Sequence, residues 1–257
     1  MGHMVIANIA YQNLKPEVRD KVDSMVGSLN TEYPEMSTFL HLAYWPDAIR
    51  SQRIETFTHW HYIDLPYSID GTKTNNDVID TDNAVWAVQR IQVIVKNKNA
   101  NPYDRARFLS FLTHIVGDLH QPLHTTTLFS AKHPNGDKGG NLFKIMYNGK
   151  LMNTHTLWDS GVGSFEGKNG RATDHAKELA VNIMQEYPVS GFGTQAQDLD
   201  PEHWAHEGFE NSKKYVYSTP ENEVPSSAYI NNGKQVAEKQ AALAGYRLAN
   251  LLNSLLS

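Results

Sequence analysis

The apolar segment LTHIVGDLHQPLH, residues 112–124, holds three histidines and one aspartate but no lysine, arginine or glutamate. On a helix, His114 and Asp118 are four positions apart and project from one face, one turn from each other. Removing a carboxylate from water costs on the order of several kcal/mol, and one histidine offsets that cost less well than a divalent cation does. The spacing therefore favours a metal site over a buried His–Asp pair.

The same spacing recurs in NTHTLWDSG, residues 153–161, where His155 and Asp159 are again four positions apart. Gly161 is expected to end this second helix, and Thr154 is its expected N-cap. A single histidine on an apolar face is usually a hydrogen-bonded core residue, but two copies of one ligand spacing are harder to explain in that way. The pattern predicts more than one metal ion.

The residues that follow the first pair offer another ligand. Pro122 should end the helix, so His124 on the exit turn can fold back toward the ligand face. His120 lies about 200° around the helix from Asp118, at about 100° per residue. Spacing alone leaves both histidines open as candidates.

Further candidates lie upstream: Asp47 in YWPDAIR, His59 and His61 in THWHYID, and His3 near the start. His59 and His61 would share a face if their segment is extended. The sequence contains no cysteine, so a metal must be held by histidine, carboxylate or backbone groups. Together these donors fit a cluster of more than one Zn²⁺.

Apolar residues recur at three- and four-residue intervals through most of the chain, which predicts helices. These helices are expected to position the candidate ligands. Helices are predicted over residues 15–29, 83–97, 107–121, 201–218 and 237–256. A β-hairpin is predicted over 141–153, where Asn148-Gly149 is typical of a type I′ turn. Two polar stretches rich in glycine and asparagine, 67–83 and 130–141, are predicted to be loops that frame a site.

Composition limits the class of protein. The chain has 257 residues, of which 40% are hydrophobic, which is enough for one domain with a buried core. Its net charge of −5 provides no basic surface for gripping duplex DNA, so nucleic-acid binding would have to be local. There is no run of about 20 apolar residues and no secretory signal pattern, and we predict neither a membrane span nor a stable protein partner.

Seven segments resemble, in order along the chain, the zinc-dependent single-strand-specific nucleases and 3′-nucleotidases of fungi, plants and bacteria. They are GHMVIANIA, WPDAIR, WHYID, HIVGDLHQPLH, GDKGGN, THTLWDSG and AGYRLANLLN, and they cover nearly the whole chain. This family shares a helical fold with bacterial zinc phospholipase C. The resemblance implies a mostly α fold, a single-domain helical bundle of that type over residues 1–257, with the one small β-hairpin predicted above.

The resemblance also implies three zinc ions at the bottom of a cleft. The ligand positions fall on Asp47, His61, His114 and Asp118 for the first ion, on His124, His155 and Asp159 for the second, and on His3 with Asp118 as a bridge for the third. His61 is thereby selected over His59, and His124 over His120. In the family the third ion is also held by the amino and carbonyl groups of an N-terminal tryptophan, five residues before this histidine. The present sequence begins Met1-Gly2-His3, so we expect a shortened N-terminus and a third site without that ligand.

The family resemblance implies a reaction and a set of substrate contacts. A zinc-activated water would attack phosphorus, giving 5′-phosphorylated products from single-stranded DNA or RNA and free phosphate from 3′-nucleotides. Asn141 resembles the residue that contacts the scissile phosphate, and Tyr62 and Asp64 resemble the pair that stacks and hydrogen-bonds a base. Independently of the resemblance, the position of Arg50 three residues after Asp47 predicts that it orients that carboxylate, helps to hold phosphate, or forms a plain surface ion pair.

Two alternatives stay open at this point. Zinc phospholipase C uses a similar ligand set but has glutamate at the last ligand position, where this chain has Asp159. A module in which metals only stabilise the helical bundle would have closed metal sites, whereas catalytic sites leave a coordination position open. A secreted or periplasmic location is implied by the resemblance alone.

Overall fold

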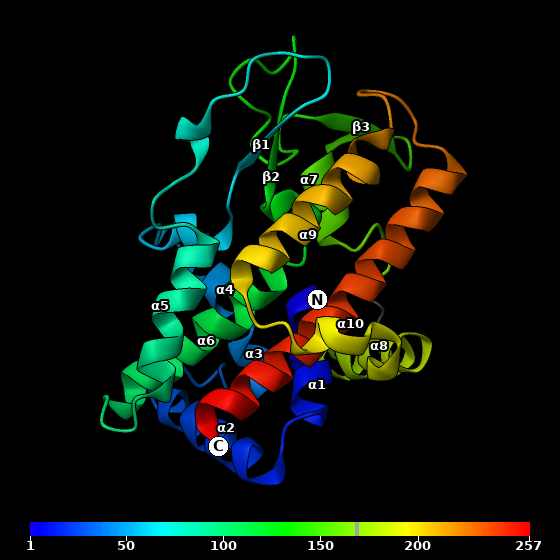
Figure 1. Cartoon of the computed structure of the whole chain (residues 1–257). Helices are drawn as coiled ribbons and strands as arrows, with labels where there is room; N and C mark the ends of the chain where they lie inside the picture. The colour runs from blue at the N-terminus through cyan, green and yellow to red at the C-terminus, as the bar shows by residue number, and fades with distance from the viewer. Residues whose placement is uncertain (168–169) are drawn as a thin grey trace.

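Helices make up most of the protein, and two small sheets lie at one end of the molecule (Figure 1). The structure is a computed structural model that describes residues 1–167 and 170–257. The α-helices are α1 (Gly2–Gln12), α2 (Pro16–Asn30), α3 (Phe39–Leu42), α4 (Trp45–Ser51), α5 (Ala84–Lys96), α6 (Pro102–Asp118), α7 (Thr154–Asp159), α8 (Ala172–Glu186), α9 (Pro201–Lys214) and α10 (Ser227–Leu256). Short 3₁₀ helices are η1 (Thr58–His61), η2 (Asn76–Val78), η3 (Pro122–His124), η4 (Val189–Gln197) and η5 (Val216–Ser218). The strands are β1 (Leu65–Ser68), β2 (Thr126–Phe129), β3 (Lys144–Tyr147) and β4 (Lys150–Asn153).

The central helix is α6, in which every residue from Leu109 to Asp118 is buried. It packs against α1, α2, α4, α5 and α10. Helices α1 and α10 lie in close contact, because a Cβ atom at Gly245 would come within 2.5 Å of the Ile9 side chain. Only glycine allows this approach without a shift of one helix, so the segment AGYRLANLLN fixes how α1, and with it His3, sits in the bundle.

The predicted helices are present, with different ends. α6 begins at Pro102 rather than 107, because Asn101 caps it by accepting the N–H of Tyr103, and it ends at Asp118 rather than 121. α9 ends at Lys214, and a 3₁₀ turn follows it. α10 begins at Ser227, ten residues before the apolar pattern starts, because Ser226 caps it and Tyr229 is buried. Local propensity underestimated the first turns of both α6 and α10.

The predicted hairpin is confirmed. β3 and β4 are antiparallel, and both turn residues have positive φ, 50° at Asn148 and 74° at Gly149, as a type I′ turn requires. The sequence did not predict the second sheet, in which β1 pairs with β2 in parallel. Each strand has four residues, and paired residues such as Leu65 and Thr126 are 61 positions apart in the sequence. Neither strand therefore has a nearby partner from which the sequence could predict it.

Two apolar clusters flank the turn after α6. The main cluster contains Leu119 and fills the helical bundle, whereas a smaller cluster under the sheets contains Leu123, Leu128 and Trp158. The backbone between Asp118 and His124 therefore passes from one core to the other. Among the described helices, none is both long and apolar enough to cross a membrane.

Candidate metal centre

The predicted ligands come from elements that are far apart in the sequence. α1 carries His3, α4 carries Asp47, η1 carries His61, α6 carries His114 and Asp118, η3 carries His124, and α7 carries His155 and Asp159. The structure brings them into three groups whose ligand atoms lie within 4.8 Å of one another. The groups are His3, His114 and Asp118; Asp47, His61 and His114; and His124, His155 and Asp159.

Short local interactions set the position of α7. Asn153, and not Thr154, is its N-cap, since the Asn153 side chain accepts the N–H of Thr156 at 2.7 Å. The prediction for Thr154 was wrong because its hydroxyl donates instead to the carbonyl of Phe143 at 2.9 Å. Gly161, with φ of 62°, follows the helix in the left-handed conformation that helix ends favour.

Around His114, donor atoms converge on one point. The Nδ1 of His114 lies 2.8 Å from the carbonyl oxygen of Ala43, which accepts a hydrogen bond from it. In the neutral ring this places the proton on Nδ1 and the lone pair on Nε2. That Nε2 lies 3.1 Å from Nδ1 of His61 and 3.2 Å from Oδ2 of Asp118. Two ring nitrogens and a carboxylate oxygen at these distances are better satisfied by a shared cation than by one another.

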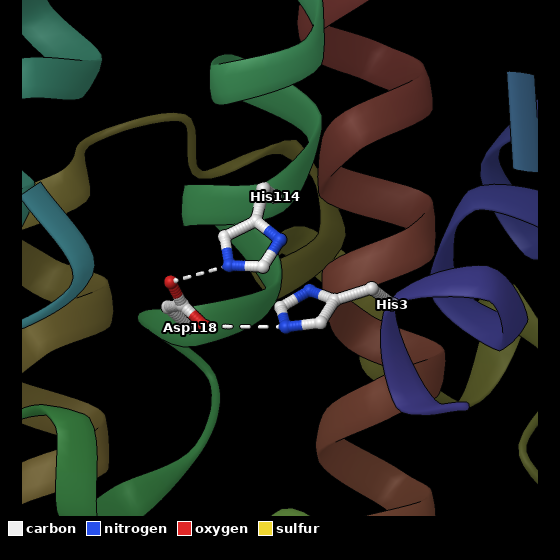
Figure 2. Close-up of side chains that lie close together, drawn as sticks. All are labelled: His3, His114 and Asp118. Carbon is white, nitrogen blue, oxygen red and sulfur yellow. Dashed lines mark ion pairs between the residues drawn. The ribbon is translucent and has the colours of Figure 1, made fainter. Parts of the chain in front are cut away.

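The Asp118 carboxylate faces two groups of histidines with its two oxygens. Oδ2 lies 3.0 Å from Nδ1 of His61 and 3.2 Å from Nε2 of His114, whereas Oδ1 lies 3.3 Å from Nε2 of His3. Figure 2 shows the contacts to His114 and His3 as dashed lines on opposite oxygens. His114 itself belongs to two of the groups, but its single free nitrogen can ligate only one ion, so Asp118 is the residue able to bridge.

The third group has the same construction. Nδ1 of His124 lies 2.6 Å from the carbonyl of His61, and Nδ1 of His155 lies 2.7 Å from the carbonyl of Gly139. Each Nε2 lies 3.4 Å from a different oxygen of Asp159. Both imidazoles are therefore held by backbone acceptors with Nε2 directed at one carboxylate, which is the usual arrangement behind a metal-binding histidine.

Neighbouring charges set the protonation of the metal-free site. Burial raises the pKa of Asp118, but His114 and His124 outweigh it and hold that pKa well below its usual value. Burial lowers the pKa of His124, but Asp118 and Asp159 outweigh it and raise the pKa to about 10. For His3 and His61, burial dominates and lowers the pKa. Asp118 is thus ionised and available as a ligand, while His124 holds a proton that a metal must displace.

The three groups open on one cleft of about 260 Å³. His61 and His114 are buried beneath it, whereas the Asp47 and Asp159 side chains are about half exposed, at 52% and 47%. The cleft lining includes His3, Asp47, Arg50, Asp118, Gln121, His124, His155 and Asp159, with Ile6, Phe165, Ala237 and Ala241 on apolar walls. Six of the eight candidate donors therefore line a cavity that a small ligand can reach, whereas His61 and His114 are buried outside its lining.

Predicted substrate residues differ in how they relate to this cleft. Arg50 lines it, one turn from Asp47 on α4. The Asn141 amide is exposed and donates to the carbonyl of Lys138 at 2.8 Å, in the loop whose Gly139 carbonyl holds His155. Asn141 is not one of the residues that line the cleft.

Tyr62 and Asp64 are one and three residues after His61, and neither of them lines the cleft. Burial raises the pKa of Tyr62 to about 12, with Asp80 and Asp64 adding to the effect. Burial, with Asp137 and Asp80, raises the pKa of Asp64 to about 7. The pair is thus half-buried in an acidic environment beside the metal ligands.

The competing histidines have other partners. His59 lies 3.3 Å from Asp82 on the surface. His120 lies 2.7 Å from the carbonyl of Val116 through Nδ1 and accepts from Arg247 at 3.0 Å through Nε2. Neither histidine belongs to any of the three donor groups found among the described residues.

The sequence did not indicate two residues that contact the candidate ligands, Gln121 and Gly117. Gln121 donates to Asp159 and caps η3, and Gly117 lies against the ring of His3. A polar residue directly before a proline was the available sign for Gln121, because that is a typical N-cap position. No such sign existed for the carbonyls of Ala43 and Gly139, since any residue supplies a carbonyl.

The protein is thus a helical bundle with three adjoining His/Asp groups that could hold metal ions beside one cleft. The family model described as S1/P1 Nuclease matches residues 1–257, and the chain belongs to that family. It is 26% identical over 278 aligned residues to Nuclease S1 of Aspergillus oryzae, covering 100% of this chain and 91% of that protein. It is 25% identical to Endonuclease 1 of Arabidopsis thaliana, covering 100% and 86%, and 23% identical to Nuclease P1 of Penicillium citrinum, covering 99% and 96%. The resemblance described from the motifs is confirmed.

Proposed function

We propose that this protein is a zinc-dependent single-strand-specific endonuclease and 3′-nucleotidase. It would hydrolyse single-stranded DNA and RNA to 5′-phosphorylated products and remove phosphate from 3′-nucleotides. The observation that carries the proposal is the shared carboxylate of Asp118, whose two oxygens face different histidines at the foot of one cleft. This arrangement supports several adjacent metal ions acting on one substrate.

The donor set fits zinc. It consists of imidazole nitrogens and carboxylate oxygens in a chain without cysteine, and Zn²⁺ accepts both kinds of ligand. His114, His124 and His155 each direct Nδ1 to a backbone carbonyl and turn Nε2 toward the other donors, so the ring orientation that a metal requires is already in place, and His124 would lose its Nε2 proton on binding. We assign Asp47, His61, His114 and Asp118 to one ion, His124, His155 and Asp159 to a second, and His3 with Asp118 to a third.

Zinc ions bound there would supply Lewis-acid chemistry, namely the activation of a water for attack on phosphorus and the neutralisation of charge on the leaving 3′ oxygen. Arg50, exposed on the cleft wall, would pair with phosphate oxygens through its guanidinium group. Asn141 would donate its amide to the same phosphate. Tyr62 would stack on an unpaired base, and Asp64 would hydrogen-bond the edge of that base, which accounts for selection of single strands.

Two alternatives make different predictions. A phospholipase C would release phosphorylated headgroup from phosphatidylcholine vesicles, and the relatives named above are nucleases rather than lipases. A structural metal module would have closed sites, whereas the half-exposed Asp47 and Asp159 side chains keep the donor groups open to the cleft.

The decisive experiment combines zinc analysis with an activity assay on one preparation. The protein is stripped with a chelator, reloaded with zinc, analysed for bound metal, and assayed for acid-soluble release from single-stranded DNA. The same preparation is assayed on double-stranded DNA of equal length and on phosphatidylcholine vesicles. A His124→Ala variant removes one ligand, and His59→Ala, which removes a surface histidine beside Asp82, is the matched control.

We expect bound zinc, activity that disappears on stripping and returns with zinc, and a strong preference for the single strand. His124→Ala should lose at least about 100-fold in rate, because it removes a ligand rather than an outer contact. His59→Ala should behave as wild type. Headgroup release without nuclease activity would favour the lipase, and tight zinc without either activity would favour the structural module.

A further inference from the structure

Gln121 joins two ligand-bearing segments through one amide. Its Nε2 donates to Oδ1 of Asp159 at 2.7 Å, and its Oε1 accepts the N–H of Leu123 at 2.6 Å. These partners fix the orientation of the amide, because a backbone N–H can only donate and an ionised carboxylate can only accept. The side chain therefore ties the turn that carries His124 to the helix that carries Asp159.

The contact makes the two oxygens of Asp159 different from each other. Oδ1 receives the Gln121 amide and lies 3.4 Å from Nε2 of His124, whereas Oδ2 lies 3.4 Å from Nε2 of His155. The Asp159 side chain is 47% exposed and is the last residue of the short helix α7. Without the amide, rotation about its side-chain bonds would be restrained only by the two imidazoles.

We propose that Gln121 is a positioning residue that holds Asp159 as a ligand at the His124, His155 and Asp159 group. The assignment rests on the proposed function, since it assumes a zinc ion at this group. A hydrogen bond to a ligating carboxylate fixes its direction, and loss of such outer contacts lowers metal affinity by about 10- to 100-fold. Gln121 also lines the cleft, and the role proposed for it is to act through Asp159.

The two roles of Gln121 can be separated by substitution. Gln121→Ser keeps an oxygen able to cap η3 by accepting the Leu123 N–H, but serine is too short to reach Asp159. Gln121→Ala removes both the cap and the contact. Gln89→Ser is the matched control, because Gln89 donates to the carboxylate of Glu202 at 3.5 Å on the surface, away from the cleft.

The test measures zinc affinity by chelator competition, the visible absorption of the Co²⁺-substituted protein, and the melting temperature of the metal-free protein. We expect Gln121→Ser to bind one metal ion about 10- to 100-fold more weakly, with an altered Co²⁺ spectrum and a metal-free melting temperature that falls less than that of Gln121→Ala. Gln121→Ala should show the same loss of affinity together with a lower melting temperature, and Gln89→Ser should match wild type.

Three outcomes would overturn the assignment. If Gln121→Ser binds every metal ion as tightly as a zinc-binding wild type, Gln121 does not position Asp159. If its metal-free melting temperature falls as far as that of Gln121→Ala, the residue is structural. A wild-type protein that binds no zinc would overturn the proposed function first and this assignment with it.

Discussion

Gly117 and His3 are in direct contact, since a Cβ atom at position 117 would lie 2.8 Å from Nδ1 of the His3 ring. The ring is stacked on His114 with centroids 3.7 Å apart, so it cannot move toward that side. The missing side chain at position 117 in α6 therefore leaves the space in which α1 presents His3 to Asp118. The glycine in HIVGDLH is explained by this approach rather than by helix geometry.

Replacing Gly117 with alanine should displace the His3 ring and weaken the proposed third zinc site. We expect Gly117→Ala to lose about one bound zinc per chain and at least tenfold in activity. Alanine is favoured over glycine within a helix by about 1 kcal/mol, so the metal-free protein should not be less stable by that route. Zinc analysis and calorimetric melting of the variant measure the two effects.

Gly27 provides the control, because it lies inside α2 and a Cβ atom there would meet nothing within 4 Å. Gly27→Ala should keep full zinc content and melt slightly higher than wild type. Full zinc content in Gly117→Ala as well would show that His3 is not a ligand.

The sequence predicted those parts of the fold that have a local cause. Apolar periodicity identified α2 and α5, and Asn148-Gly149 identified the hairpin, because each depends on neighbours within a few residues. The β1–β2 pair was not predicted, since its strands have partners only in the folded chain. Periodicity likewise failed for α1, which is almost wholly buried between Met4 and Ala10 and so has no polar face.

In the candidate site, too, some features follow from nearby residues and others depend on how distant segments pack together. Residue type and spacing identified His114 with Asp118 and His155 with Asp159 as pairs on one helix face. Spacing could not choose His124 over His120, because the choice depends on Arg247, which comes from α10 and occupies His120. Nor could it show that Asp118 faces His3 and His61 with different oxygens, which depends on how α1 and η1 pack against α6.

Asp64 should destabilise the metal-free protein at neutral and higher pH. Burial, Asp137 and Asp80 raise its pKa to about 7 from 3.8, so the folded state holds the proton more tightly than the unfolded state does. The folded state is therefore favoured most below about pH 4 and loses this contribution as the pH rises to about 7. A pKa difference of about 3 between the folded and unfolded states corresponds to about 4 kcal/mol in the free energy of unfolding. Because Asp64 is partly exposed, we reduce this figure to about 2 kcal/mol.

Asp64→Asn should accordingly raise the free energy of unfolding by about 2 kcal/mol at pH 8 and leave it nearly unchanged at pH 4. Urea unfolding at the two pH values measures this difference. Asp82→Asn, which removes an exposed carboxylate beside His59, is the control for the loss of a surface negative charge. An equal effect of Asp64→Asn at both pH values would contradict the raised pKa.

Glu207 neutralises the fully buried Arg247 and should contribute strongly to stability. Its two oxygens accept from the guanidinium at 2.7 and 2.8 Å, and the same group donates to His120, whose pKa burial and Arg247 lower to about 3. Glu207→Gln leaves the Arg247 cation without its counter-charge. We expect the free energy of unfolding to fall by about 3 kcal/mol, which is at the lower end for broken buried ion pairs because the Glu207 side chain is 27% exposed.

Glu210 on the same helix is the matched control, because its ion pair with Lys213 is exposed to solvent. Glu210→Gln should change the free energy of unfolding by no more than about 0.5 kcal/mol. Denaturant unfolding of both variants gives the comparison, and similar losses would mean that Arg247 does not depend on Glu207.

Zinc binding should release protons and strengthen with pH. Burial lowers the pKa of His124, but Asp118 and Asp159 raise it to about 10, so this imidazole is protonated at pH 7 in the metal-free protein, and a ligand must be neutral. The pKa of His114 is also raised, by Asp118 and Asp47 against the effect of burial. Zinc affinity should therefore rise at least about tenfold per pH unit between pH 6 and 8. Titration calorimetry in buffers of different ionisation enthalpy counts the released protons, and an affinity that does not change with pH would rule out His124 as a ligand.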